Sequence, residues 1–359
     1  MSAPLRMLFF TGSLGAGGSE AHLVQLLGLL DRDRVSPELM LMQADWDYHR
    51  LPSIRRQGIP VHDLRWDGRR RGLARMFSDA RRVVARIRPH ILKSYGYPCD
   101  VFAPLMAFGR RRPRIITTRR TNQPYAKRRL LYRLTNPLVD CIVPNSRAAE
   151  DFAVSTEGLD RRRSRIVVNG VDLEKFRPAP CLRDGALRWG VHARLRHVKG
   201  IDLLLEAFAG AELENVELHI AGATLDAWGK TLRERFEHHR SIHFHGDVDD
   251  AAAFLHGLDR FVLPSRSEAM SMSLLESMAC GLPVVATDVG GNREVLDEGR
   301  AGILVEPSVE GLREGLLRLT HDPEQAAQLG RAARLRVEQH YGLETMVRRY
   351  EQLYDELAR

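Results

Sequence analysis

Two cations five positions apart follow a short apolar run in the second half of this 359-residue chain. Arg194 and Lys199 fall within Trp189–Asp202, which reads as the end of a strand, a loop and the start of a helix. Cations in such a loop can converge on one diphosphate, because arginine supplies a planar fork and lysine a point charge. Solvated loop cations would show the same spacing, so the pair is informative only together with other groups.

The most specific pattern places two glutamates with seven residues between them. Glu268 follows the strand-like run Arg260–Leu263, and Glu276 falls two turns along the next helix. The free amides and the dipole at the start of that helix suit a phosphate, and carboxylates accept hydrogen bonds from sugar or ribose hydroxyls. The pattern therefore fits a ligand with phosphate and hydroxyl groups, although two surface carboxylates would have the same spacing.

A glycine-rich turn, Gly12–Glu20, follows the first strand-like run. Glycines let the backbone approach a ligand closely, and the start of the next helix attracts negative charge. The turn matches neither the G-x-G-x-x-G pattern of dinucleotide sites nor the G-x-x-x-x-G-K-[ST] pattern of P-loops, so neither kind of site follows. A purely structural tight turn explains it equally well.

Strand-like runs and amphipathic helical stretches alternate along the chain and must position these groups. Such alternation indicates parallel, doubly wound α/β sheets, in which ligands bind beyond the carboxyl ends of the strands. The pattern breaks at Glu174–Gly185, where prolines cluster and the charge balance changes. We expect two tandem Rossmann-like domains that face a cleft, residues 1–173 and 174–340, followed by a helical segment, residues 341–359. The expected strands are Leu5–Thr11, Glu38–Met42, Ile59–Leu64, His90–Lys93, Arg114–Thr118, Cys141–Val143, Arg165–Val168, Leu187–His192, Val216–Ala221, Ile242–Phe244, Arg260–Leu263, Pro283–Thr287 and Gly302–Val305.

Composition excludes several classes of protein. No window approaches the roughly 20 apolar residues of a membrane span, and the N-terminus makes a poor signal peptide. The four cysteines are at least 40 positions apart without a C-x-x-C pair, so we expect buried, reduced thiols. The 14 histidines show no H-E-x-x-H motif and no cluster at metal-ligand spacing, so no metal site is predicted.

The net charge of +8 is divided unevenly along the chain. Residues 1–175 hold 32 basic and 17 acidic side chains, a net +15, whereas the remainder holds 22 and 29, a net −7. Most of these basic residues are arginines, which occur in runs such as Arg110–Arg112 and Arg161–Arg163. The first half therefore has either a solvated arginine-rich surface or an anionic partner, such as a lipid headgroup surface, a lipid phosphate or nucleic acid.

Taken together, these segments resemble the retaining glycosyltransferases of family 4, which have the GT-B fold. The resemblance covers essentially the whole chain and is strongest in the second half. The segments that carry it are Gly17–Glu20, Asn169–Asp172 with Phe176 and Pro178, Arg194, Lys199-Gly200, the Glu268–Glu276 run and Gly281–Gly291.

This resemblance implies a donor site for a UDP- or GDP-linked sugar as co-substrate, with no cofactor and no obligatory metal. The implied catalytic residues are Arg194 and Lys199, which would grip the diphosphate, and Glu268, which would hold the donor sugar, while Glu276 would hold the ribose. Sugar would be transferred with retained configuration, by front-face attack in which the leaving phosphate accepts the acceptor's proton. The other implied donor contacts are Gly17, Gly18, Val248, Met270, Ser271, Met272, Ser273 and Leu274.

The first domain is expected to bind the acceptor. Many relatives have a histidine after the strand corresponding to His90–Lys93, whereas this sequence has Tyr95, which does not shuttle protons near neutral pH, so the donor sugar stays open. We predict that Tyr95, Arg119, Arg120 and Asn122 bind the acceptor. Our hypothesis is a saccharide or lipid-linked saccharide used in cell-surface polysaccharide or glycolipid synthesis.

Basic amphipathic stretches bear on where the protein works. Lys127–Leu134 combines basic and apolar residues, so it is either a helix that lies on an anionic membrane surface or an ordinary helix whose apolar face belongs to the core. We therefore expect a cytoplasmic protein, peripheral on the inner face of the cytoplasmic membrane. By the family pattern, the C-terminal helix would pack back against the first domain.

Two alternatives to a transferase stay open. A nucleotide-sugar epimerase of the same fold would bind the nucleotide but would need no acceptor. A nucleic-acid-binding protein would use the basic half, although no helix-turn-helix, zinc-finger or RNA-recognition signature accompanies the charge. The leading hypothesis is a transferase that does not bind nucleic acid.

Overall fold

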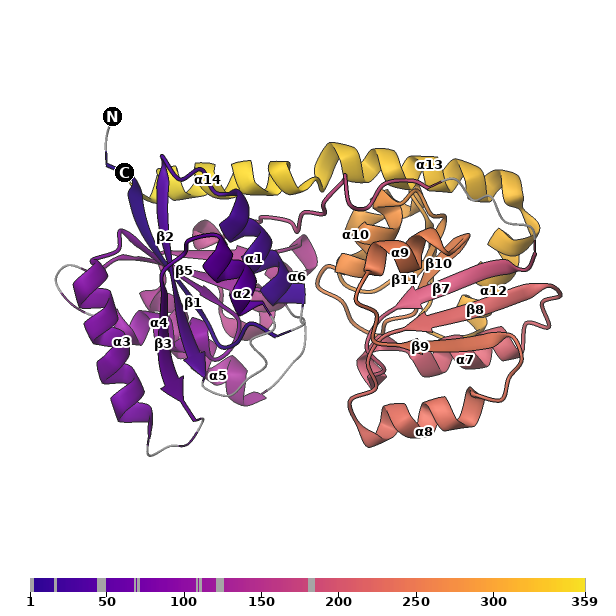
Figure 1. Ribbon diagram of the computed structural model, residues 1–359, viewed down its shortest axis with the longest axis horizontal. Coiled ribbons are helices and arrows are strands. Elements are labelled where there is room, and N and C mark those ends of the chain that lie inside the picture. The colour runs from indigo at the N-terminus through magenta and orange to yellow at the C-terminus, as the bar shows by residue number, and fades with distance from the viewer. Residues whose placement is uncertain are drawn as a thin grey trace. The chain divides into compact units, whose positions relative to one another are not determined.

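The computed structural model describes residues 3–15, 18–43, 50–67, 69, 72–107, 109, 112–120, 126–179 and 185–358. Contacts within the chain separate two compact units (Figure 1). Unit 1 consists of Met1–Val168 and Glu344–Arg359, and unit 2 is the continuous segment Asn169–Leu343. Unit 1 therefore contains both ends of the sequence.

Unit 1 is built on a six-stranded parallel sheet with the order β3-β2-β1-β4-β5-β6. The central strand β1 is apolar over most of its length, as is typical of strands covered on both faces, and Met7 to Phe10 are fully buried. The strands are β1 (Leu5–Thr11), β2 (Val35–Gln43), β3 (Val61–Trp66), β4 (Ile91–Tyr95), β5 (Arg114–Arg119) and β6 (Cys141–Pro144). The helices are α1 (Gly18–Leu29), α2 (Leu51–Arg56), α3 (Leu73–Ile87), α4 (Cys99–Met106), α5 (Ala126–Thr135), α6 (Arg147–Glu157) and α14 (Leu343–Ala358).

Unit 2 repeats this plan with a parallel sheet of order β12-β11-β10-β7-β8-β9. Its largest fully buried side chain is Trp189 of β7, whose indole donates to Thr320 Oγ1 at 3.1 Å. The strands are β7 (Leu187–His192), β8 (Val216–Ala221), β9 (Ile242–Gly246), β10 (Arg260–Leu263), β11 (Val284–Thr287) and β12 (Ile303–Val305). The helices are α7 (Ile201–Ala209), α8 (Ala227–Phe236), α9 (Ala251–His256), α10 (Met272–Ala279), α11 (Asn292–Val295), α12 (Val309–His321) and α13 (Pro323–His340).

Polar contacts anchor α14 on unit 1. The buried ammonium of Lys93, on β4, donates to Tyr354 Oη at 2.8 Å and lies 3.3 Å from the centre of the Tyr350 ring. Glu351 accepts a hydrogen bond from the backbone N–H of Asp31 at 3.0 Å. The last helix is thus held beside β4 and beside the turn between α1 and β2.

The predicted fold class is confirmed, because each unit is a doubly wound parallel sheet with helices. The predicted strand Arg165–Val168 is wrong. There the chain makes an isolated bridge, Ser164 to Ile142, and two backbone hydrogen bonds to β6, from Arg165 N–H to the Ile142 carbonyl and from Val167 N–H to the Pro144 carbonyl, both 3.0 Å, before it passes into unit 2. The units divide at 168/169 and at 343/344, where the sequence predicts 173/174 and 340/341.

Two further sequence expectations concern membranes and thiols. None of the described helices combines the length and the apolar character needed to cross a bilayer. Cys99, Cys141 and Cys280 are free and buried, whereas Cys181 lies outside the described residues.

Candidate active site

A lysine and a glutamate from two neighbouring loops form an ion pair at the carboxyl edge of the unit 2 sheet. Lys199 follows β7 and Glu268 follows β10, which are adjacent in the sheet. Lys199 Nζ and Glu268 Oε1 are 2.6 Å apart, and the same oxygen accepts a hydrogen bond from Ser265 Oγ at 2.7 Å. The glutamate side chain is 8% exposed and the lysine side chain 30%, so a ligand in solvent can reach the ammonium.

The close approach of these two loops depends on Gly200. Its φ is 63°, and a Cβ there would lie 2.0 Å from the carbonyl oxygen of Pro264, so only glycine fits. Arg266 then ties the loop after β10 to α7 through a bidentate ion pair with Asp202, at 2.6 and 2.7 Å. Together these contacts hold the ion pair in place before any ligand binds.

The second predicted carboxylate, Glu276 on α10, is mostly buried. Burial raises its pKa to about 7, and the charge of Lys175 opposes this shift. His192 Nδ1 lies 3.9 Å from Glu276 Oε2, but burial lowers the pKa of His192, so this imidazole does not supply a compensating charge at neutral pH. Glu276 is therefore poised between its charged and neutral forms near neutrality.

Replacing Glu276 by glutamine should remove a pH dependence of stability. The folded protein binds the Glu276 proton more tightly than the unfolded chain does, so the stability that this group contributes is fully present below pH 4.5 and is lost as the pH rises to about 7. We expect Glu276→Gln to match the wild type below pH 4.5 and to exceed it by up to about 3 kcal/mol above pH 7. Urea unfolding at a series of pH values measures this, and a difference that stays constant with pH would contradict the raised pKa.

The start of α10 supplies backbone donors beside these carboxylates. Ser271 caps the helix, with its Oγ accepting from the Leu274 N–H at 3.4 Å. Asn169 Nδ2 donates to the Met270 carbonyl at 3.4 Å and so holds the residues before the helix. The predicted donor contacts 270–274 thus share one turn, whose free N–H groups and dipole favour an anion.

The other predicted donor residues are divided between the units. Arg194 and Val248 are partly buried and follow β7 and β9, so they lie at the same carboxyl edge as the ion pair. Gly18 is the first residue of α1 in unit 1, and Gly17 lies outside the described residues. Unit 2 alone therefore assembles two cations, two carboxylates and a helix start along one edge of its sheet.

Unit 1 has a cavity of about 140 Å³ at the carboxyl ends of β4 and β5. Two of the predicted acceptor residues, Arg119 and Arg120, line it together with Arg128 and Arg129 of α5. Asp100 and Glu157 line it too and pair with Arg119, so the charge in excess comes from Arg120, Arg128 and Arg129, which favours an anionic group. A third predicted acceptor residue, Asn122, lies outside the described residues.

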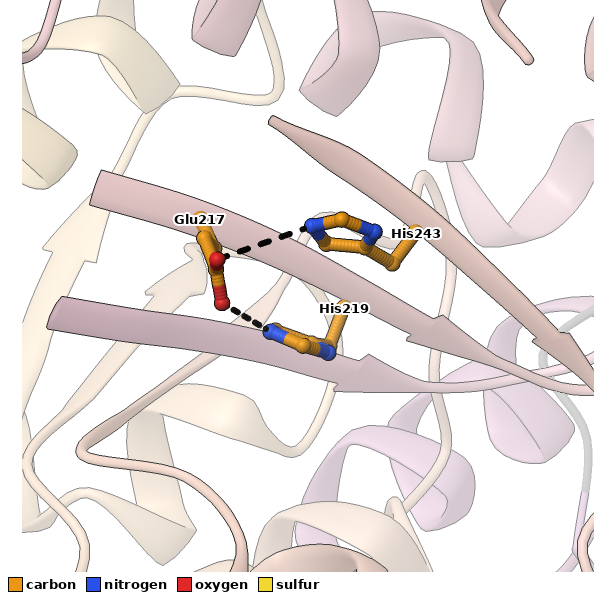
Figure 2. Close-up of side chains that lie close together, drawn as sticks. All are labelled: Glu217, His219 and His243. Carbon is orange, nitrogen blue, oxygen red and sulfur yellow. Dashed lines mark hydrogen bonds and ion pairs between the residues drawn. The ribbon is translucent and has the colours of Figure 1, made fainter. Parts of the chain in front are cut away.

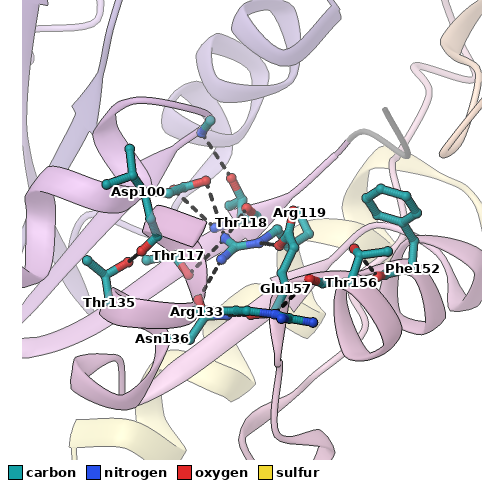
Figure 3. Close-up of polar contacts among 12 residues, drawn as sticks. Asp100, Thr117, Thr118, Arg119, Arg133, Thr135, Asn136, Phe152, Thr156 and Glu157 are labelled. Atoms are coloured by element: carbon teal, nitrogen blue, oxygen red, sulfur yellow. Dashed lines mark hydrogen bonds and ion pairs between the residues drawn. The ribbon is translucent and has the colours of Figure 1, made fainter. Parts of the chain in front are cut away.

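Arg119 itself is enclosed by protein partners (Figure 3). Its side chain is 3% exposed, and its Nε and Nη2 donate to Glu157 at 2.5 Å and to Asn136 at 2.7 Å. Asp100 Oδ2 lies 3.5 Å from Nη1. We therefore expect Arg119 to position the wall of the cavity, which leaves Arg120 as the predicted direct contact with an acceptor.

The fourth predicted acceptor residue, Tyr95, ends β4 but is not part of the cavity lining that the structure describes. Its side chain is 5% exposed, and its ring centre lies 5.9 Å from that of His22. Within the described part of the chain its buried hydroxyl has no hydrogen-bond partner, and burial raises its pKa well above the ordinary value. Tyr95 can therefore donate a hydrogen bond but does not act as a base.

One group of possible metal ligands in unit 2 was not predicted from the sequence. Glu217, His219 and His243 lie close together on β8 and β9. The signal that could have found them is a spacing of two along neighbouring strands, in Glu217-x-His219 and His243-x-His245.

Sequence models of two families match the chain in succession. The model described as Glycosyltransferase Family 4 matches residues 16–175, and the model described as Glycosyl transferases group 1 matches residues 176–336. The chain is a family 4 glycosyltransferase. The predicted membership of family 4 is therefore confirmed, as is the class of transferase.

Curated relatives of this glycosyltransferase are themselves named as sugar transferases. The D-inositol 3-phosphate glycosyltransferase of Pseudarthrobacter chlorophenolicus is 29% identical over 239 residues, which cover 60% of this chain and 56% of the relative. The D-rhamnosyltransferase WbpZ of Pseudomonas aeruginosa is 28% identical over 270 residues, which cover 68% of each chain. The match thus spans little more than half of the inositol phosphate enzyme.

Solved structures show the same fold. The structure of Anabaena Alr3699/HepE in complex with UDP is similar, with a TM-score of 0.86 and 20% sequence identity. The match covers 98% of this glycosyltransferase and 100% of that chain. The lipopolysaccharide outer core galactosyltransferase WaaB has a TM-score of 0.76 and 15% identity, covering 98% of this chain and 100% of that chain. This glycosyltransferase therefore has the GT-B fold.

Proposed function

We propose that the chain is a retaining glycosyltransferase that moves a sugar from a UDP- or GDP-linked donor to a saccharide or lipid-linked acceptor in cell-surface polysaccharide or glycolipid synthesis. The observation that carries the proposal is the Lys199–Glu268 pair beside the start of α10. A diphosphate is bound by cations and backbone amides, and the hydroxyl groups of a sugar donate hydrogen bonds to a carboxylate. The structures of Alr3699/HepE with UDP and with UDP-glucose support a nucleotide sugar as the donor.

Donor binding would exchange the partners of this ion pair. Lys199 turns from Glu268 to the diphosphate, where Arg194 adds a second cation. Glu268, oriented by Ser265, accepts hydrogen bonds from the donor sugar, and Glu276 accepts them from the ribose.

The bond between the sugar and the diphosphate breaks as the acceptor oxygen attacks the same face of the sugar. Negative charge then grows on the leaving phosphate, where Lys199, Arg194 and the α10 amides stabilise it more strongly than in the ground state. That phosphate accepts the acceptor's proton, so the reaction needs no side chain as a base. The configuration is retained because the acceptor attacks the face from which the phosphate departs.

Nucleotide release tests the proposal. Free UDP and GDP are measured for a panel of UDP- and GDP-sugars, with and without a bacterial lipid extract, and NMR assigns the anomeric configuration of the product. Release that needs one donor and the extract together supports transfer, whereas conversion of a donor without an acceptor indicates an epimerase. A protein that binds no nucleotide sugar, but binds duplex DNA in a salt-sensitive way, would overturn the proposal in favour of the nucleic-acid alternative.

Peripheral binding at the inner face of the cytoplasmic membrane is part of the proposal. Leu130 and Leu134 of α5 are 60% and 64% exposed, and Arg129 and Arg133 on the same helix are exposed as well. Leucines beside cations on one helix suit an anionic bilayer surface, where the lipid covers the apolar side chains and attracts the charges. A lipid-linked acceptor would be presented at the same surface.

Replacing both leucines by serine, in Leu130→Ser/Leu134→Ser, should weaken binding to anionic vesicles at least about 10-fold. Each leucine that inserts contributes about 1.5–3 kcal/mol of apolar transfer, which the serines lose. Sedimentation with phosphatidylglycerol vesicles measures the change, and Leu335→Ser, which alters a leucine 53% exposed on α13, is the matched control. Equal pelleting of all three proteins would contradict a role for α5.

A further inference from the structure

Three side chains with metal-binding atoms, Glu217, His219 and His243, lie close together on β8 and β9 (Figure 2). The two strands pair in parallel, with His219 opposite His243. Because side chains alternate between the faces of a sheet, Glu217 shares the face of His219. Leu218 and Ile220 point to the opposite face, into the core of unit 2.

The distances between these groups are close to those of a coordination sphere. Glu217 Oε2 is 3.1 Å from His219 Nε2, and Glu217 Oε1 is 3.9 Å from His243 Nε2. Ligand atoms on a tetrahedral ion with bonds of 2.0–2.1 Å lie about 3.3 Å apart, so small side-chain movements would close the site. His243 Nε2 is buried and has no hydrogen-bond partner in the described part of the chain, which leaves one polar atom unused at the group's centre.

Two neighbouring residues orient the same groups. His245 Nε2 lies 2.9 Å from His219 Nδ1, as in metal sites where the second ring nitrogen of a ligand histidine is hydrogen-bonded. Arg188 Nε donates to Glu217 Oε2 at 3.1 Å. The arginine fixes the carboxylate but repels a cation, so an ion bound here must owe its affinity mainly to the imidazoles.

We propose that Glu217, His219 and His243 bind a divalent transition-metal ion such as Zn²⁺ or Co²⁺. Two imidazoles and a carboxylate suit these ions, whereas Mg²⁺ and Ca²⁺ prefer oxygen ligands throughout. The side chains of His243 and Glu217 are 40% and 30% exposed, so an ion can enter and water can complete its coordination.

A metal here would link the edge strand β9 to β8. The chain continues from β9 directly to Val248, a predicted donor contact. The ion would therefore hold the edge strand β9, which leads to Val248, against β8. It takes no part in the proposed transfer step.

Titration with Co²⁺ tests the site, because visible absorption by the bound ion reports its coordination. Protein stripped with a chelator is titrated with Co²⁺, and Zn²⁺ binding is then measured by calorimetry. The wild type should bind a single equivalent of either ion, and His219→Gln and His243→Gln should each weaken binding at least about 10-fold. His238→Gln changes a histidine that is 90% exposed in the same unit and should leave binding unchanged.

Circular dichroism and melting temperature establish that each variant is folded. A wild type without a Co²⁺ band, or a band that both His219→Gln and His243→Gln retain in full, would overturn the proposal. Tighter binding of Mg²⁺ than of Zn²⁺ would overturn it as well. These measurements do not depend on sugar transfer, so their outcome is independent of the proposed function.

Discussion

Alanine at Lys199 is expected to lower kcat/KM for sugar transfer by about 100- to 1000-fold, which corresponds to about 3–4 kcal/mol of transition-state stabilisation. The loss follows from the growing charge on the leaving diphosphate, which the ammonium would no longer meet. Arg194 and the amides at the start of α10 remain, so activity should fall without vanishing. Initial rates of nucleotide release, measured with the donor that the panel identifies, give the change.

Two controls separate this effect from a loss of fold. Lys230→Ala removes an exposed lysine of α8 and should keep the wild-type rate. Lys199→Ala also deprives the mostly buried Glu268 of its cation, so its melting temperature must be measured in parallel. A folded Lys199→Ala protein with the wild-type kcat/KM would show that this lysine does not act on the diphosphate.

The second large effect is on stability. Arg119→Met would leave the carboxylates of Asp100 and Glu157, whose side chains are 0% and 8% exposed, without their cation. Removing one partner of a buried ion pair costs about 3–5 kcal/mol, because an uncompensated charge stays behind. We expect the free energy of unfolding in urea to fall by that amount at pH 7, and by less in acid, because burial raises the pKa of Asp100 and protonation removes its charge.

Arg162→Met is the matched control for the arginine network. Arg162 is 90% exposed and pairs with Asp160 on the surface of unit 1, where water screens the interaction. Its loss should leave the unfolding midpoint unchanged. If both variants unfold at the wild-type urea concentration, the Arg119 network does not stabilise the unit.

Elements with a strong local signal could be predicted with their bounds. The predicted strands Leu5–Thr11, Leu187–His192 and Arg260–Leu263 are β1, β7 and β10 with the same bounds, and at the start of α13 Asp322 accepts from the Gln325 N–H at 2.8 Å. Such signals lie within a few residues, because a cap or an apolar stripe needs only its own element. The resemblance to family 4 likewise implied that Lys199 and Glu268 serve one site, and the structure places both at one edge of the unit 2 sheet.

Contacts between distant elements could not be predicted in the same way. The charge of Arg119 is visible in the sequence, but Glu157, which encloses it, lies 38 residues further along. His219 and His243 meet only because β8 and β9 pair in one register, and a shift of one residue would turn His243 to the other face. Pairing and register depend on the packing of the whole unit.

The arrangement of the chain, with unit 2 inserted before α14, also sets an order of assembly during synthesis. The ribosome makes all of unit 2 before it completes α14. Lys93 on β4 therefore meets Tyr354 only after unit 2 has been made. At about 5–20 residues per second, the ribosome needs on the order of ten seconds or more to synthesise the chain between β4 and Tyr354. Throughout this time, Lys93 lacks its contacts with Tyr350 and Tyr354, and the surface that α14 will cover has no partner from that helix. The unit that is begun first is completed last.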